Sequence, residues 1–262
     1  MGVTNIDTVL MILTLSTVMP TEARDVVTSE MIRGFVEGCK LASTICSGGQ
    51  TVHNPWPLIG GTASAMVRSS SIVRPDIAEP GDVLVLTKPL GTQIVGNLAL
   101  WLLDDSRWSS TVSKLITEEA AKRAIRAGEE FMMRLNMNAS RVMCEVGAHG
   151  ATDVTGFGIL GHASNLAAVQ KNPVDFEITA LPIIKGLVPL EKGITIDYKL
   201  TEGVSAETSG GLLVILPPGK VETFMDKMKQ SGEPDVWIVG KVVEGKREAK
   251  ILDRNVIQII DV

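Results

Sequence analysis

The sequence is poor in aromatic residues and has no excess of basic ones. Phe, Trp and Tyr make up 4% of the 262 residues, whereas 45% are hydrophobic. A sizeable core must therefore be built mainly from aliphatic side chains, which favours α/β layers over an aromatic-rich sandwich. The formal net charge of -5 gives no electrostatic footprint for nucleic acid. We therefore expect no nucleic-acid partner.

Cysteine is also scarce, and its spacing excludes the common zinc motifs. Three cysteines without C-x-x-C spacing indicate a reducing compartment, so we expect a cytoplasmic protein with these side chains buried as small hydrophobes. Combined with the three histidines they form no zinc-ligand pattern, and we interpret His149 as a satisfied loop residue and His162 as packed at a helix start. These six residues are Cys39, Cys46, Cys144, His53, His149 and His162.

The apolar run over residues 7–16 is too short and too interrupted to span a bilayer. It also lacks the basic segment of a signal peptide, so we expect no membrane partner. The run is typical of a strand buried on both faces. We expect this strand to have an unpaired edge, and the chain to lack a segment upstream of it.

A linker with two prolines and a glycine over residues 74–82 divides the chain. We predict domains over residues 1–78 and 79–262, without internal repeats. Helical periodicity predicts a helix over residues 21–42 in the first domain, followed by a strand or bent hairpin over 58–73. In the second domain the expected helices are 92–103, 117–146 with a break at Asn136 or Asn138, and 221–228; the expected strands are 83–87, 176–178, 211–216, 236–239 and 249–260. Alternating strands and helices indicate a layered α/β domain.

A first glycine cluster, Gly48-Gly49-Gln50-Thr51, lies between a strand and the turn at residues 54–57. Glycines let backbone N–H groups approach a ligand without Cβ collisions, and Thr51 adds a hydroxyl donor. No lysine follows as in a Walker loop, and no helix follows as in a dinucleotide fingerprint. An ordinary turn and a nucleotide-binding loop both fit this spacing.

A second cluster places Asp153, Thr152 and Thr155 ahead of a glycine-rich turn that runs into a helix. A carboxylate beside hydroxyls suits a hard cation, which prefers oxygen ligands. Free N–H groups at a helix start suit a phosphate. The two together are typical of a site that handles a metal-bound nucleotide. The alternative is a helix N-cap followed by a packing glycine.

In a third cluster Glu207, Thr208 and Ser209 precede Gly210 and Gly211 at the start of an apolar strand. A β-bulge or a close backbone approach explains the two glycines. Glu207 could support the site, and the sequence leaves this open.

Four segments resemble selenophosphate synthetase (selenide, water dikinase), in the same order along the chain and close to its eukaryotic branch. They are GGQTVHNPW (48–56), PGDVLVLTKPLG (80–91), ATDVTGFGILGH (151–162) and ETSGGLL (207–213). The resemblance implies an enzyme that uses ATP to convert selenide and water into selenophosphate, AMP and orthophosphate, for selenocysteine synthesis. It also implies an α/β fold like that of aminoimidazole ribonucleotide synthetase, with an N-terminal α/β domain that dimerises through its sheet and a C-terminal α/β sandwich with a mixed sheet.

By this resemblance Gly48, Gly49, Gln50 and Thr51 match the ATP-binding segment, and Asp153 matches one of the aspartates that hold Mg²⁺. The family's catalytic cysteine or selenocysteine, its lysine and its other magnesium aspartates belong to a segment upstream of these residues. We therefore assign no catalytic residue here and expect this chain to be inactive alone. The implied partners are selenide, ATP, a second copy in the full-length protein, and selenocysteine-pathway proteins. The alternatives are another ATP-dependent enzyme of the superfamily, against which residues 51–56 argue, and a non-catalytic scaffold.

Overall fold

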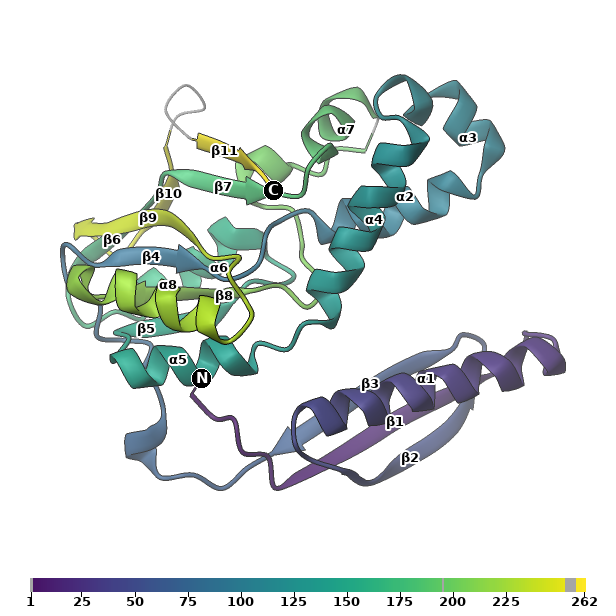
Figure 1. Cartoon of the computed structure of the whole chain (residues 1–262), viewed down its shortest axis with the longest axis horizontal. Coiled ribbons are helices and arrows are strands. Elements are labelled where there is room, and N and C mark those ends of the chain that lie inside the picture. Colours follow the sequence, from purple (N-terminus) through teal and green to yellow (C-terminus); the bar gives the residue numbers. More distant parts are fainter. Residues whose placement is uncertain (1, 195, 253–257) are drawn as a thin grey trace. The chain divides into compact units, whose positions relative to one another are not determined.

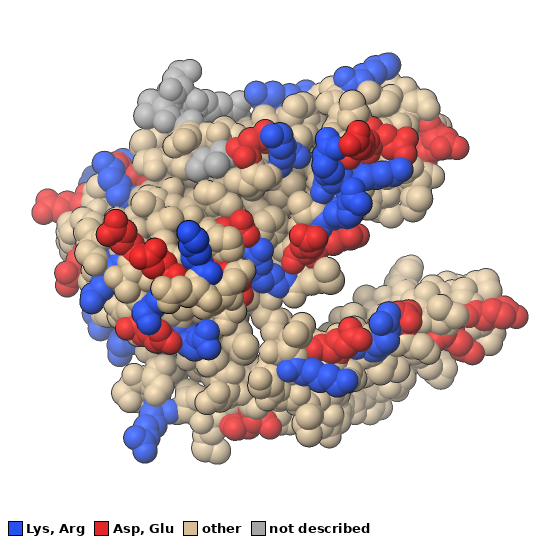
Figure 2. Space-filling model, in the orientation of Figure 1, with Lys and Arg blue, Asp and Glu red and all other residues tan. Residues whose placement is uncertain are grey.

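The computed structural model describes residues 2–194, 196–252 and 258–262. The chain forms two compact units, Gly2–Ile72 and Val73–Val262 (Figure 1). They separate directly before the proline-containing segment that begins at Arg74. In the described part of the chain, no helix has the length and apolarity needed to cross a membrane. Figure 2 shows acidic and basic side chains interspersed over the visible face.

The N-terminal unit is a three-stranded sheet with one helix packed on it. Its strands lie in the order β2-β1-β3, with β1 parallel to β2 and antiparallel to β3. The parallel strands need a crossover, which the long helix α1 supplies. The Phe35 ring of α1 lies so close to β3 that a Cβ on Gly61 would be 2.8 Å from it. The elements are β1 (Thr8–Ser16), α1 (Thr21–Leu41), β2 (Cys46–Asn54), β3 (Leu58–Ser64) and a 3-10 turn at Ser69–Ser71.

Two expectations for the first strand are wrong. β1 is the central strand, so both of its edges are paired. Val9 and Leu13 are buried beneath α1, whereas Leu10 and Ile12 on the opposite face are 46% and 52% exposed. The apolar side chains of this run therefore alternate between two faces of the sheet. Helix α1 covers one face, and the other is exposed in this chain.

The C-terminal unit is built on a six-stranded mixed sheet. The strands lie in the order β10-β6-β9-β4-β8-β5, and all neighbours are antiparallel except β10 and β6. A separate parallel pair joins β7 and β11. The strands are β4 (Val83–Leu86), β5 (Gly150–Asp153), β6 (Val174–Ile178), β7 (Ala180–Ile183), β8 (Leu212–Leu216), β9 (Trp237–Glu244), β10 (Ala249–Ile251) and β11 (Gln258–Asp261).

Helices cover both faces of this sheet, as Figure 1 shows. The helices are α2 (Thr92–Leu102), α3 (Asp105–Ser110), α4 (Glu118–Met133), α5 (Met137–Val146), α6 (Gly158–Ala168), α7 (Leu187–Gly193) and α8 (Val221–Gln230). Short 3-10 turns occur at Val112–Lys114, Leu200–Glu202 and Pro218–Lys220. The predicted helices at 92–103 and 221–228 are confirmed. The predicted break in the helix 117–146 is confirmed too, because α4 ends at Met133 and α5 begins at Met137.

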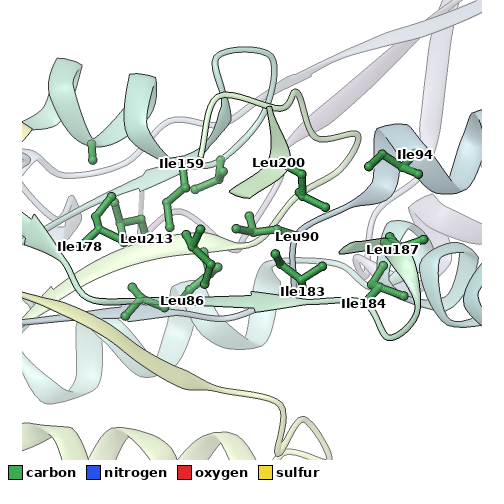
Figure 3. Packing of buried hydrophobic residues seen from close by; sticks show 14 of the residues in the cluster. Leu86, Leu90, Ile94, Ile159, Ile178, Ile183, Ile184, Leu187, Leu200 and Leu213 are labelled. Atoms are coloured by element: carbon green, nitrogen blue, oxygen red, sulfur yellow. The ribbon is translucent and has the colours of Figure 1, made fainter. Parts of the chain in front are cut away.

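Strand alternation divides the C-terminal core into two layers. Leu86 of β4 and Leu213 of β8 point into the larger layer, which Figure 3 shows reaching Ile159 of α6. Val85 and Val214 point to the other face, where they pack with α5 and α8. The predicted C-terminal sandwich with a mixed sheet is therefore confirmed. Of the predicted strand 249–260, the structure shows Ala249–Ile251 and Gln258–Asp261, and residues 253–257 lie outside the described part.

The cysteines are less buried than their scarcity suggested. All three are free thiols. Cys39 is buried, Cys46 is partly exposed and Cys144 is exposed, so the expectation of buried small hydrophobes holds for Cys39 alone. Burial raises the pKa of the Cys39 thiol.

Candidate nucleotide and metal site

The segment from Gly48 to Thr51 lies within strand β2 rather than in a loop, which corrects the sequence-based interpretation. β2 is an edge strand and pairs with β1 along one side only in the described sheet. Its residues Gly48 to Thr51 are exposed. Gly49 has a φ of 143°, and a Cβ there would lie 1.8 Å from the Met11 carbonyl oxygen. The glycine therefore lets the edge strand approach β1 where any side chain would collide.

A shallow hollow of about 440 Å³ adjoins this segment. It is lined by Met11, Cys46 and Ser47 together with all four residues from Gly48 to Thr51. Because the second edge of β2 is unpaired in the described sheet, its outward backbone groups are available to a ligand. The hollow and the free edge together suit a ligand that forms hydrogen bonds with backbone N–H and C=O groups.

Asp153 is the last residue of β5 in the C-terminal unit. Its side chain is exposed, and among the described residues no hydrogen bond or ion pair engages its carboxylate. The Thr152 hydroxyl, instead of joining a ligand set, donates to the Asp153 carbonyl oxygen at 3.1 Å. Both carboxylate oxygens of Asp153 are therefore free to accept from a ligand.

The turn after Asp153 is fixed by His162. Phe157 N–H donates to His162 Nε2 at 3.3 Å, so the Thr155 hydroxyl, 3.2 Å from the same nitrogen, donates to it as well. Burial lowers the pKa of His162, and the charge on Asp153 opposes that shift. Helix α6 begins with no side-chain cap. The N-cap part of the alternative interpretation is therefore wrong, whereas its packing glycine is confirmed, because a Cβ on Gly158 would lie 2.5 Å from the Gly203 carbonyl oxygen.

Glu207 performs the capping role, but on a different helix. Its buried carboxylate accepts hydrogen bonds from Gly91 N–H at 2.8 Å, from Thr92 N–H at 2.9 Å and from the Thr92 hydroxyl. Two of these donors are amides at the start of α2, which have no carbonyl partner within the helix. Burial raises the pKa of Glu207 to about 7, and the three hydrogen bonds oppose the shift. Glu207 therefore supports the fold next to the site rather than contacting a ligand.

We expect Glu207 to make folding stability depend on pH. The pKa rises from 4.5 in the unfolded chain to about 7 in the folded one, so the folded protein binds more protons between these values. Stability should then fall as the pH rises from 4.5 to 7, by about 3 kcal/mol at most. Urea unfolding at pH 5 and pH 7.5 measures this difference. Glu207→Gln should reduce that pH dependence, and an unchanged slope in this variant would contradict the assignment.

The two glycines after Glu207 are explained by close backbone approach, as predicted. A Cβ on Gly210 would lie 1.9 Å from the Val154 carbonyl oxygen, and a Cβ on Gly211 would lie 2.4 Å from the backbone nitrogen of Lys88. Val154 N–H donates to the Gly211 carbonyl at 2.9 Å. The glycine pair therefore holds β8 directly against the residue that follows Asp153.

The Asp153 carboxylate could provide one ligand of a magnesium ion, but the described residues around it do not form a complete metal site. Within residues 2–194, 196–252 and 258–262, no three His, Cys, Asp or Glu side chains gather around a common point. Magnesium is commonly held by one or two carboxylates plus phosphate oxygens. The unengaged Asp153 carboxylate fits that role, and a nucleotide would have to supply further oxygens.

Residues 79–253 match the family described as AIR synthase related protein, C-terminal domain. The chain therefore belongs to the AIR synthase related proteins. It is 44% identical over 258 residues to selenide, water dikinase of Trypanosoma brucei brucei (strain 927/4 GUTat10.1), covering 97% of this chain and 66% of that protein. It is 43% identical over 264 residues to human selenide, water dikinase 2, covering 99% of this chain and 58% of that protein. The chain thus spans about three fifths of these relatives, and the resemblance to selenophosphate synthetase is confirmed.

Solved structures share the fold. The hydrogenase maturation protein HypE of Escherichia coli has a TM-score of 0.68 at 14% identity, with 95% of this chain and 71% of that chain covered. Thiamine-monophosphate kinase of Stenotrophomonas maltophilia K279a has a TM-score of 0.67 at 16% identity, with 94% and 71% covered. A HypE structure in complex with ATP has a TM-score of 0.67 at 14% identity, with 95% and 71% covered. The α/β fold implied by the sequence resemblance is confirmed.

Proposed function

We propose that this chain forms part of an enzyme that uses ATP to make selenophosphate from selenide and water, with release of AMP and orthophosphate. The observation that carries the proposal is the 43–44% identity to selenide, water dikinases over nearly the whole chain. The selenophosphate would supply selenocysteine synthesis and bring the protein into contact with other proteins of that pathway. We place the reaction in the cytoplasm, where the three free thiols would stay reduced.

We assign the nucleotide contact in the N-terminal unit to the β2 segment. Gly48, Gly49, Gln50 and Thr51 line a hollow where backbone and hydroxyl donors can meet ATP, and ATP is the ligand in the HypE complex. Asp153 would hold magnesium against the phosphates through its unengaged carboxylate. When bound, magnesium supplies the charge neutralisation on which phosphoryl transfer depends.

We infer that residues 1–262 alone have no turnover and bind nucleotide weakly. Among the described residues Asp153 is the one free carboxylate of the resembled metal motif, and a single carboxylate supplies too little charge to hold several magnesium ions, each of which typically takes one or two carboxylates. Cys39, Cys46 and Cys144 belong to none of the resembled segments, so none of them is assigned as the catalytic thiol.

The experiment is ³¹P NMR of ATP and selenide with the chain, using the full-length Trypanosoma brucei brucei relative as the positive control. The relative should form AMP, orthophosphate and selenophosphate. The chain alone should form none above background. A different product pattern, such as ADP with another acceptor, would assign the chain to another ATP-dependent activity of the same fold.

We further propose that the open face of the N-terminal sheet joins two copies of the protein. Leu10 and Ile12 are about half exposed there, and large exposed apolar patches mark contact surfaces. The two side chains also line a hollow shared with Gly49 and Gln50. A partner copy would therefore lie next to the proposed nucleotide segment.

Ile12→Asp tests this interface. A charge at the centre of an apolar contact should shift a dimer to monomer, with at least a hundredfold weaker association. Val26→Asp is the matched control, because Val26 is 64% exposed on α1. Analytical ultracentrifugation should show dimer for the control and monomer for Ile12→Asp. A dimer in both variants would exclude this face as the interface.

A further inference from the structure

Three consecutive backbone amides next to Asp153 have no protein partner. Within the residues that the structure describes, the N–H groups of Ser209, Gly210 and Gly211 donate to no acceptor. The amides on either side are paired, Thr208 N–H with the Thr92 hydroxyl and Leu212 N–H with the Thr87 hydroxyl, each at 2.8 Å. Gly210 and Gly211 are buried. Buried amides are nearly always paired, so an unpaired run points to an absent acceptor.

The left-handed conformation of Ser209 in this run is one that anion-binding turns contain. Ser209 adopts a φ of 49°, a left-handed conformation that non-glycine residues rarely take. Successive N–H groups around a left-handed residue converge on one point and form a concave anion site. Thr208 and Ser209 are exposed, so the run opens to the surface at its first residues.

The carbonyl groups of Ser209 and Gly210 accept hydrogen bonds from the side chains of Lys88 and Asn136. The backbone N–H groups that follow these carbonyls point in the opposite direction. Lys88 Nζ donates to the Ser209 carbonyl at 2.8 Å, and Asn136 Nδ2 donates to the Gly210 carbonyl at 2.9 Å. In a trans peptide the C=O and the following N–H point in opposite directions. The N–H groups of Gly210 and Gly211 therefore face away from Lys88 and Asn136.

The buried charge behind the run favours an anion. The Lys88 side chain is 3% exposed and is held by two carbonyls, with no carboxylate hydrogen-bonded to it. Burial lowers its pKa to about 8, so the ammonium is still largely charged at neutral pH. Arg134 lies close enough to contribute to that lowering, and its Nη1 is buried without a partner in the described structure. Glu233 lies close enough to oppose that lowering, and Arg134 Nη2 pairs with Asp235 at 2.8 Å. Among the described residues, the charged group that hydrogen-bonds directly to the run is therefore the Lys88 ammonium.

The run also lies beside the proposed metal ligand. Asp153 is directly opposite Leu212 in the β5–β8 register, and Gly210 packs on the Val154 carbonyl. We propose that the amides of Ser209, Gly210 and Gly211 form a phosphate-class oxyanion subsite next to Asp153. This assignment deepens the proposed function, because the oxyanion would be a phosphoryl group of the nucleotide reaction. Binding of the free anion does not depend on turnover.

The test is a ¹⁵N NMR titration of the chain with inorganic phosphate, against sodium chloride at matched ionic strength. The amide resonances of residues 209–211 should shift together and saturate with a single dissociation constant. Lys88→Met removes the buried charge and should weaken phosphate binding about tenfold. Lys122→Met is the matched control, because Lys122 is exposed and pairs with Glu118 on α4. That variant should bind as the unmodified chain does.

Ser209→Gly keeps every amide of the run and suits the left-handed conformation, so it should bind phosphate within about threefold of the unmodified chain. It is a control for the Ser209 side chain, and the titration of the unmodified chain still tests the subsite if Lys88→Met does not fold. Amides 209–211 that do not shift, or that shift without saturation, would overturn the subsite. So would an equal loss in Lys88→Met and Lys122→Met. Saturable binding without ATP-to-AMP turnover in the full-length protein would overturn the proposed function and leave the subsite in place.

Discussion

Asp153→Asn should reduce magnesium-dependent turnover of the full-length protein at least about a hundredfold, the size expected when a group that supports the metal at an active site is removed. The amide keeps the shape of the side chain but removes the negative charge that Mg²⁺ requires. The carboxylate engages no hydrogen bond or ion pair in the described structure. The free energy of unfolding should therefore change by less than about 0.5 kcal/mol.

Asp226→Asn is the matched control for that variant, since Asp226 is exposed on α8. Turnover should be followed as AMP release over a range of magnesium concentrations. Binding of Mn²⁺, followed by electron paramagnetic resonance in the presence of ATP, gives a readout independent of chemistry. Equal turnover in the two variants would remove Asp153 from the metal site.

Gly49→Ala should destabilise the N-terminal unit by about 3 kcal/mol or more, because a Cβ overlaps backbone that cannot move cheaply. The added atom would lie 1.8 Å from the Met11 carbonyl oxygen and 2.7 Å from the Met11 nitrogen. The positive φ of Gly49 adds strain for any L residue. Either β2 separates from β1 there, or the pairing shifts along the strand.

Gly48→Ala provides the comparison one residue away. Its Cβ would meet Leu10 Cδ2 at 3.5 Å, an ordinary contact, so this variant should cost less than about 1 kcal/mol. Urea unfolding monitored by circular dichroism, combined with limited proteolysis of the N-terminal unit, measures both. Similar stabilities for the two variants would contradict the described pairing of β2 with β1.

Structure that is local in the sequence could be predicted, whereas structure made by pairing between distant segments could not. Asp153 is a proposed metal ligand, and the adjacent carboxylate, two hydroxyls and glycine turn that indicate it are local in the sequence. The break between α4 and α5 was visible as two asparagines. By contrast, Gly48–Thr51 forms an edge strand that glycines usually weaken, so its strand character comes from pairing with β1.

The short strand β5 was missed for a related reason. Four residues carry too little periodicity to identify a strand, and β5 is defined by its antiparallel register with β8. The role of Glu207 was equally hidden, since its partners Gly91 and Thr92 lie more than a hundred residues earlier. The sequence around Glu207 contains no pattern that indicates contact with the start of a helix so far away along the chain.

The distance between Glu207 and α2 bears on how the protein is made. The first turn of α2 takes its acceptor from a residue 115 positions further along the chain. On the ribosome that turn stays incomplete until residue 207 has emerged, even though α2 itself was synthesised long before. Order in the C-terminal unit is therefore expected to arrive in one late cooperative step, and a nascent chain stalled before that point should remain sensitive to proteases near residue 91.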